Sequence, residues 1–312
     1  MKVLVTGAAG TIGRRVLFEL SARGHELRAL DVGSLKNRLR ARRSPRQIGW
    51  VWGDVRSRAT VDDAVAGVDA IIHLAAVLPP RAYEATVEAI SVNLDGAQTV
   101  TEAAVAMRRP VIFIYTSSAA VYGVTQAQKP PVRPHQPAFA TDEYTRAKLC
   151  VEEILRNAPL SWVILRLSHV PILGMRMPHR VMFEIPLDNR MELLHADDAA
   201  LAIVNALESE NCRRRMLLIG GGQTCQVLYK DYLAQALSAM GLAMPPDRAF
   251  STQYHYSDWL DTAESERLLH YQRHSFADIM QSVEQNGRRL RPLALALTPL
   301  LGPALTRFSP YV

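Results

Sequence analysis

The fold of this 312-residue chain is decided near its start, where residues 2–22 read KVLVTGAAGTIGRRVLFELSA. The apolar run KVLVT predicts a short buried strand, and the apolar spacing in RRVLFELSA predicts a helix. Between them the glycine-rich GAAGTIG predicts a tight turn. Because the free N–H groups at the start of a helix favour an anion, this strand, turn and helix together predict a site for a phosphate group.

The glycines of this turn follow the spacing Gly-x-x-Gly-x-x-Gly, which differs from the Gly-x-Gly-x-x-Gly of the common dinucleotide fingerprint. Without side chains, the backbone can approach a pyrophosphate closely. Asp31 ends the next apolar run, where a carboxylate can accept hydrogen bonds from the hydroxyls of an adenosine ribose but would repel a 2′-phosphate. We therefore expect NAD as the cofactor, with NADP less favoured. The residues expected to hold it here are Gly7, Gly10, Thr11, Ile12, Gly13 and Asp31.

Along the rest of the chain, short apolar runs alternate with helical segments, a pattern typical of a parallel sheet covered by helices on both faces. Further strands are predicted at residues 26–30, 48–52, 70–74, 111–115, 162–167 and 216–219. Further helices are predicted at residues 61–66, 87–107, 144–157 and 197–208. We expect an α/β protein built on a Rossmann-type doubly wound parallel sheet.

The same pattern suggests how the chain is divided. Residues 1–168, with returns to the sheet at about 191–220, are expected to form an NAD-binding Rossmann domain. Residues 169–190 and 221–312 are expected to form a smaller, interleaved C-terminal domain that binds the substrate.

Composition limits the classes of function. With 48% hydrophobic and 21% charged residues, the chain can bury a substantial core. The net charge of +6 is modest, but basic residues crowd one segment after the second predicted strand. We favour a solvated loop there and expect no nucleic-acid partner, because no aromatic side chains are interleaved. The basic residues are Lys36, Arg38, Arg40, Arg42, Arg43 and Arg46.

Three features bear on the location of the protein. Cys150, Cys212 and Cys225 are odd in number and lack metal-ligand spacing, which favours a reducing cytoplasm and gives no reason to expect a metal. Met1 leads directly into the first strand, so we expect no signal peptide. Prolines interrupt the apolar stretch at 290–308, which falls short of the ~20 residues needed to span a bilayer, so we expect no stable membrane insertion.

In a parallel sheet of this kind, ligands bind beyond the carboxyl ends of the strands. Asp54 and Val55 follow the third predicted strand, and Leu74 ends the fourth. The small side chains of Ala75 and Ala76 would let the backbone pass close to a cofactor. These residues are therefore candidates for contacts with NAD.

A second motif, TDEYTRAK at residues 141–148, indicates catalysis. If this segment is helical, Tyr144 and Lys148 lie on one face within reach of one another. A phenol with a pKa near ~10 is a poor acid or base at neutral pH, but a neighbouring ammonium lowers that pKa. Ser118 follows the fifth predicted strand, and its hydroxyl can bind the substrate oxygen with which Tyr144 exchanges a proton.

Taken in order, these motifs resemble those of the extended short-chain dehydrogenase/reductases, the NAD-dependent epimerase/dehydratase family, over the first two-thirds of the chain. The resemblance implies that Tyr144 is the catalytic acid or base and that Ser118 holds the reacting oxygen. It implies that Lys148 lowers the pKa of the tyrosine and binds the nicotinamide ribose. It also places Asp54 and Val55 beside the adenine.

The resemblance extends to further segments. Asn93 resembles the family's asparagine in the helix after the fourth strand, and we count it among the cofactor-binding residues. The segment LHADDA, residues 194–199, resembles a late family motif that is usually structural. The resemblance also implies a homodimer through the predicted helices 87–107 and 144–157.

Departures from the family pattern decide which reaction to expect. The family's 4,6-dehydratases carry an acidic pair where this chain has Ala119 and Ala120, so we do not expect dehydration. Its epimerases carry an asparagine where this chain has His169, so an epimerase reaction is less expected but stays an alternative. The leading hypothesis is an NAD-dependent oxidoreductase acting on a secondary alcohol or ketone, such as that of a sugar. The alternative is a nucleotide-sugar epimerase with tightly bound NAD, and the complete catalytic set argues against a non-catalytic NAD sensor.

The small-molecule substrate is expected to contact Ser118, Ala119, His169 and Arg176. Arg176 belongs to a basic cluster with His179 and Arg180 that suits a phosphate or carboxylate, although a solvated surface explains the cluster equally well. A later patch of aromatic and polar residues either lines a substrate pocket or braces the domain, and the sequence leaves both open. The patch comprises Tyr254, His255, Tyr256, Trp259 and Asp261.

Overall fold

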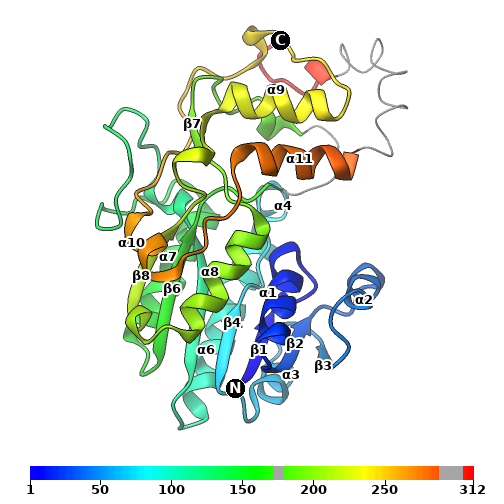
Figure 1. Ribbon diagram of the computed structural model, residues 1–312, viewed down its shortest axis with the longest axis vertical. Helices are drawn as coiled ribbons and strands as arrows, with labels where there is room; N and C mark the ends of the chain where they lie inside the picture. Colours follow the sequence, from blue (N-terminus) through cyan, green and yellow to red (C-terminus); the bar gives the residue numbers. More distant parts are fainter. Residues whose placement is uncertain (172–178, 288–304) are drawn as a thin grey trace.

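The computed structural model describes residues 1–171, 179–287 and 305–312, and its centre is a seven-stranded sheet in the order β3-β2-β1-β4-β5-β6-β8 (Figure 1). All six neighbouring strand pairs in this sheet are parallel. The order reverses direction between β1 and β4, which creates a crevice at the carboxyl ends of these strands. This confirms the predicted doubly wound sheet. The strands are β1 (Lys2–Thr6), β2 (Glu26–Asp31), β3 (Ile48–Trp52), β4 (Ala70–His73), β5 (Ile112–Ser118), β6 (Ser161–Leu167) and β8 (Arg215–Ile219).

Helices cover both faces of the sheet because successive strand residues point to opposite sides. Val3 and Val5 belong to the apolar cluster that includes α1 (Thr11–Ala22) and α8 (Ala196–Glu208). Leu4 belongs to the cluster on the other face, with α3 (Arg58–Val65), α6 (Gly96–Ala106) and α7 (Glu143–Asn157). Among the described residues, no helix is long and apolar enough to cross a membrane.

A smaller unit with its own apolar cluster lies beyond the carboxyl ends of the strands (Figure 1). It contains an antiparallel pair, β7 (Arg190–Glu192) with β9 (Gln226–Leu228), and α9 (Tyr229–Ala239) beside α11 (Phe276–Gly287). In the segment expected to return to the sheet, about 191–220, α8 and β8 do so, whereas β7 pairs with β9 and not with the seven-stranded sheet among the described residues. The remaining helices are α2 (Leu35–Ala41), α4 (Arg81–Glu84), α5 (Thr86–Ile90) and α10 (Ala263–Leu269).

The segment predicted as one helix at 87–107 is not a uniform α-helix. A π-helical segment, Ser91–Asp95, separates α5 from α6. Asn93 lies in this wider segment, and its side chain pairs with both backbone groups of Val77. Its Nδ2 donates to the carbonyl oxygen of Val77 at 2.9 Å, and its Oδ1 accepts from the backbone N–H of Val77 at 2.7 Å. Such π-helical segments frequently occur at functional sites.

The basic segment after β2 is partly helical rather than a loop. Ser34 caps α2 by accepting a hydrogen bond from the backbone N–H of Asn37. The guanidinium of Arg38 lies 4.9 Å from the ring centre of Trp52, which anchors this helix to β3. The expectation of a solvated loop missed both the cap and the cation–π contact.

Candidate active site

The glycine turn has no room for side chains. Gly7 has φ of +67°, and a Cβ added to it would lie 2.8 Å from the backbone nitrogen of Ala75. A Cβ on Gly10 would lie 2.9 Å from the carbonyl oxygen of Gly7, and one on Gly13 would lie 2.8 Å from the Cα of Ala8. Within the described part of the chain no side chain caps the start of α1, so its first N–H groups are available to an anion. The turn therefore fits the diphosphate of NAD.

Asp31 lies at the end of β2 and ties this strand to the glycine turn. Its Oδ2 accepts a hydrogen bond from the backbone N–H of Ala9 at 2.8 Å, and its Oδ1 accepts one from the side chain of Asn37 at 2.9 Å. Burial raises the pKa of the Asp31 carboxyl, while the hydrogen bond from Ala9 lowers it. Sequence reasoning identified Asp31 but missed Asn37, whose role depends on the position of α2.

Beside β3, the carboxylate of Asp54 is bound by the guanidinium of Arg56, with Nε 3.0 Å from Oδ1. This hydrogen bond lowers the pKa of the Asp54 carboxyl. Val55 is buried, and a Cβ on Gly96 would lie 2.7 Å from its Cγ2, so Val55 packs closely on the start of α6.

The chain after β4 is held from two sides. The hydroxyl of Thr6 accepts hydrogen bonds from the backbone N–H groups of Leu74 and Ala75, each at 3.2 Å. The next turn, after Ala76, is held through Val77 by the Asn93 side chain. Asn93 thus supports the loop predicted to contact the cofactor, and Thr6 is a support that the sequence did not reveal.

His73 ends β4 as a fully buried imidazole. Its Nδ1 lies 2.9 Å from the Thr6 hydroxyl, whereas its Nε2 has no hydrogen-bond partner among the described residues. Burial, with a smaller effect from Lys148, lowers the pKa of His73 to about 3, so the ring is neutral at physiological pH.

The structure brings Ser118, Tyr144 and Lys148 together. Ser118 is the last residue of β5, and Tyr144 and Lys148 are one turn apart in α7, which begins at a capping box formed by Asp142 and Thr145. Lys148 is buried, with its Nζ 5.8 Å from the ring centre of Tyr144 and donating to the carbonyl oxygen of Thr116 at 2.8 Å.

The ionisation of this group differs from the expectation based on Lys148 alone. Burial, and then Tyr256, raise the pKa of the Tyr144 phenol, while a hydrogen bond with Ser118 lowers it. Burial also lowers the pKa of Lys148 to about 8, against the opposing effect of Glu152. The expected net lowering of the Tyr144 pKa is therefore wrong for the protein alone, because burial outweighs the hydrogen bond with Ser118 that lowers it.

A buried ionic cluster joins the strands to α7. Glu152 is fully buried one turn after Lys148 and accepts a hydrogen bond from the Ser117 hydroxyl at 2.7 Å. The guanidinium of Arg166 in β6 binds both carboxylate oxygens of Glu152, at 2.8 and 2.7 Å. The cluster fixes the end of β5 against α7, and its only sequence signal was the spacing of Glu152 from Lys148.

The predicted substrate residues lie at different depths. Ala119 follows Ser118 directly, at the start of a short 3₁₀ turn. His169 is exposed after β6, with its ring 6.0 Å from that of Tyr232. His179 contacts Glu84 at 2.9 Å, and Arg176 lies outside the described residues.

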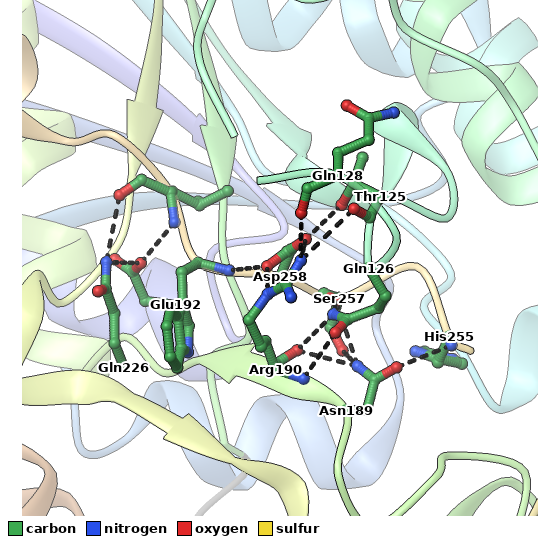
Figure 2. A network of polar contacts seen from close by, with 12 residues as sticks. Thr125, Gln126, Gln128, Asn189, Arg190, Glu192, Gln226, His255, Ser257 and Asp258 are labelled. Carbon is green, nitrogen blue, oxygen red and sulfur yellow. Dashed lines mark hydrogen bonds and ion pairs between the residues drawn. The ribbon is translucent and has the colours of Figure 1, made fainter. Parts of the chain in front are cut away.

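A polar network links the segment after β5 to β7 and to residues 255–258 (Figure 2). Arg190 binds Asp258 with two hydrogen bonds of 2.7 and 2.9 Å, and Thr125 donates to the same carboxylate at 2.7 Å. Asn189 accepts from the backbone N–H of His255 and donates to Ser257. This network positions part of the aromatic patch that the sequence analysis had left unassigned.

One group of metal-ligand side chains occurs within the described residues: His195, Asp197 and His274 offer ligand atoms within 4.8 Å of one another. The two imidazole rings stack face to face, with centres 3.9 Å apart. Asp197 is engaged by Arg15, and His274 binds Asp198 through Nδ1 at 2.6 Å. Because imidazole lone pairs lie in the ring plane, stacked rings do not direct them at a common ion, so this arrangement does not favour a metal.

Comparisons with known proteins agree with the fold. The structure matches a UDP-glucuronic acid 4-epimerase of Bacillus cereus, solved with UDP-glucuronic acid and NAD, with a TM-score of 0.79, 22% identity and coverage of 93% of this chain and 100% of that one. In sequence, the chain is 30% identical over 172 residues to a UDP-glucose 4-epimerase of Bacillus subtilis, covering 50% of this chain and 48% of the relative. It is also 30% identical over 163 residues to a 3-beta-hydroxysteroid dehydrogenase of Mycolicibacterium neoaurum, covering 49% and 42%.

The chain spans between 20% and 52% of the length of the curated relatives that it matches. The match to a family model is broader, since it runs from residue 3 to residue 220 and includes the glycine turn, Asp31, Ser118, Tyr144 and Lys148. It confirms the predicted resemblance and, through the family description, the dependence on NAD. The chain belongs to the NAD dependent epimerase/dehydratase family.

Proposed function

We propose that the protein transfers hydride between NAD and a secondary alcohol or ketone carbon of a sugar or similar polyhydroxylated compound. The observation that carries this proposal is the convergence of Ser118, Tyr144 and Lys148 at the carboxyl end of β5, the edge of the parallel sheet at which the glycine turn also lies. Bound NAD supplies the hydride acceptor or donor for such chemistry. The glycine turn and Asp31 would hold it.

In this proposal Tyr144 moves the proton. When an alcohol is oxidised, Tyr144 accepts the hydroxyl proton while Ser118 binds the same oxygen, and reduction runs in the opposite direction. Burial and the neighbouring Tyr256 raise the pKa of Tyr144, so a positive charge on Lys148 would favour the phenolate as the proton moves. The pKa of Lys148, about 8, leaves it mostly protonated near neutral pH.

A second candidate is a nucleotide-sugar epimerase, in which hydride returns to the carbon that it left. The similarity to UDP-sugar 4-epimerases in sequence and fold supports it. Both candidates begin with the same oxidation and differ in whether NADH is released.

The first test separates these candidates by cofactor exchange. Purified protein is incubated with labelled NAD, and its bound nucleotide is identified and its exchange rate measured. Rapid exchange with net NADH formation from an alcohol supports the dehydrogenase. The epimerase is supported if bound NAD survives dialysis and the protein epimerises UDP-glucose without net formation of NADH. Protein that binds no nicotinamide nucleotide contradicts both.

The second test concerns the catalytic group. Tyr144→Phe should reduce turnover by at least about 100-fold, because it removes the group that transfers the proton. It should leave the affinity for NAD nearly unchanged, since the glycine turn is untouched. Tyr311→Phe, at an exposed position near the C-terminus, is the control. Full activity of Tyr144→Phe would refute the assignment.

We also propose a division of labour, a dimer and a location. Residues 1–168 would bind NAD, and residues 169–190 and 221–312 would bind the substrate, as the separate apolar cluster around β7 and β9 supports.

A homodimer would form through the 87–107 and 144–157 helices, since Val87 is 83% exposed, and light scattering tests this. The three cysteines are free, which agrees with a reducing cytoplasm.

A further inference from the structure

A chain of hydroxyl groups lies beside the catalytic tyrosine. The hydroxyl of Tyr83, in α4, donates a hydrogen bond to Oδ2 of Asp142 at 3.1 Å. It also lies 2.7 Å from the hydroxyl of Tyr256. A phenol has one proton, and Tyr83 gives its proton to the carboxylate, so Tyr256 must be the donor to Tyr83. The chain therefore runs from Tyr256 through Tyr83 to Asp142.

This chain ends next to Tyr144. Asp142 is the N-cap of α7, two positions before Tyr144, and its Oδ1 is fixed by the backbone N–H of Thr145 at 2.7 Å. A small cavity is lined by Tyr144 together with Ala82, the residue before Tyr83. Burial raises the pKa of the Tyr144 phenol most, and the nearby Tyr256 raises it further.

The position of Tyr256 is set by the network of Figure 2, which holds the residues on both sides of it. On one side, the backbone N–H of His255 donates to Asn189 at 2.9 Å. On the other, the carbonyl oxygen of Ser257 accepts from Asn189 at 3.2 Å and from Gln126. The backbone around Tyr256 is thus anchored, while its hydroxyl contacts only the partly exposed Tyr83 among the hydrogen-bond partners identified for it in the described chain.

We infer that Tyr83 and Tyr256 bind a substrate hydroxyl close to the carbon oxidised at Tyr144, and that they select a neutral sugar over a sugar acid. The inference rests on the proposed function. A substrate hydroxyl can accept from Tyr256 and donate to Tyr83 or Asp142, so it enters the chain without leaving a group unpaired. A carboxylate has no proton to donate, and it would lie beside the negative charge of Asp142.

With this inference, different residues in and beside the aromatic patch fill the two roles that the sequence left open for it. Asp258 and Trp259 brace the domain, since Asp258 binds Arg190 and Trp259 donates through its indole N–H to the carbonyl oxygen of Val227. Tyr256 instead contacts Tyr83, which binds Asp142 at the N-terminus of the helix that carries Tyr144. One short segment thus serves both functions.

The test compares UDP-glucose with UDP-glucuronate as probes on the NAD-loaded full chain, measuring kcat/KM from product analysis and NADH formation. The wild type should use UDP-glucose at least about tenfold better, the ratio expected for one unfavourable charge contact. Tyr83→Phe and Tyr256→Phe should each lower kcat/KM for UDP-glucose about tenfold, mainly through KM. Because the two hydroxyls form one chain, the double variant should lose less than the product of the single losses.

Two further variants sharpen the test. Tyr254→Phe is the matched control, since this tyrosine is 48% exposed in the same segment, and it should stay within about twofold of the wild type. Asp142→Asn keeps a cap for α7 but removes the charge, so it should raise the relative use of UDP-glucuronate about tenfold. NAD affinity and circular dichroism confirm that each variant is folded.

The outcomes distinguish this inference from the proposed function. If the wild type converts UDP-glucose but Tyr83→Phe and Tyr256→Phe behave like Tyr254→Phe, the inference is overturned and the proposed function stands. If the wild type prefers UDP-glucuronate, the inference is likewise overturned while the proposed function stands. If the wild type, loaded with NAD, converts neither compound, the choice of sugar nucleotides fails, and this inference fails with it.

Discussion

Replacing Glu152 by glutamine should destabilise the protein by about 3 kcal/mol, because it breaks a buried ion pair. The Glu152 side chain is 0% exposed and that of Arg166 is 4% exposed, so water cannot replace the lost partner. Arg166 now donates to both carboxylate oxygens, at 2.8 and 2.7 Å, and Ser117 donates to one of them at 2.7 Å. In glutamine one of these oxygens becomes an NH₂ group, which cannot accept from the guanidinium.

The change is measured by urea denaturation, followed by circular dichroism, with the slope compared between variants. Glu153→Gln is the control, since Glu153 is the exposed neighbour in the same helix and its loss should cost less than about 0.5 kcal/mol. Turnover should fall as well, because Ser117 precedes Ser118 and Glu152 holds β5 against α7. Equal stability of the two variants would refute our account of the cluster.

Three other predictions follow from the site. Gly13→Ala should weaken NAD binding at least about tenfold, because the added Cβ would lie 2.8 Å from the Cα of Ala8. The control is Gly49→Ala, whose Cβ would lie 3.7 Å from its nearest atom, so this variant should bind NAD normally. Calorimetry measures both affinities, and equal values would contradict the prediction. The pKa of His73 is lowered from 6.5 to about 3, so between about pH 7 and 5 the imidazole takes up a proton in the unfolded chain but stays neutral in the folded protein. The free energy of unfolding should therefore fall by about 2 kcal/mol as the pH falls over this range. His73→Asn should flatten that slope in urea titrations, and an unchanged slope would count against the assignment. Asp31→Ala should reduce the preference for NAD over NADP at least about tenfold in a kinetic comparison, and an unchanged ratio would exclude Asp31 as the selecting residue.

Much of the fold was predictable because it depends on patterns local in the chain. The strand, glycine turn and helix at residues 2–22, and the alternation of apolar runs with helices, led to the correct parallel sheet. The errors lie where distant contacts override local pattern. The helix at 87–107 widens around Asn93 because that side chain binds Val77, and the basic segment becomes helical where Arg38 packs on Trp52.

By itself, the sequence determined the family, and it pointed to the glycine turn and to Ser118, Tyr144 and Lys148 as the proposed catalytic residues, since each depends on residue type at a short, fixed spacing. Only the tertiary structure decided what surrounds them. Tyr83 and Tyr256 meet although they are 173 positions apart, and no pattern in the chain indicates such a contact. The direction of the Tyr144 pKa shift was equally hidden, because a spacing reveals the neighbouring ammonium of Lys148 but not the burial that raises the pKa of the phenol.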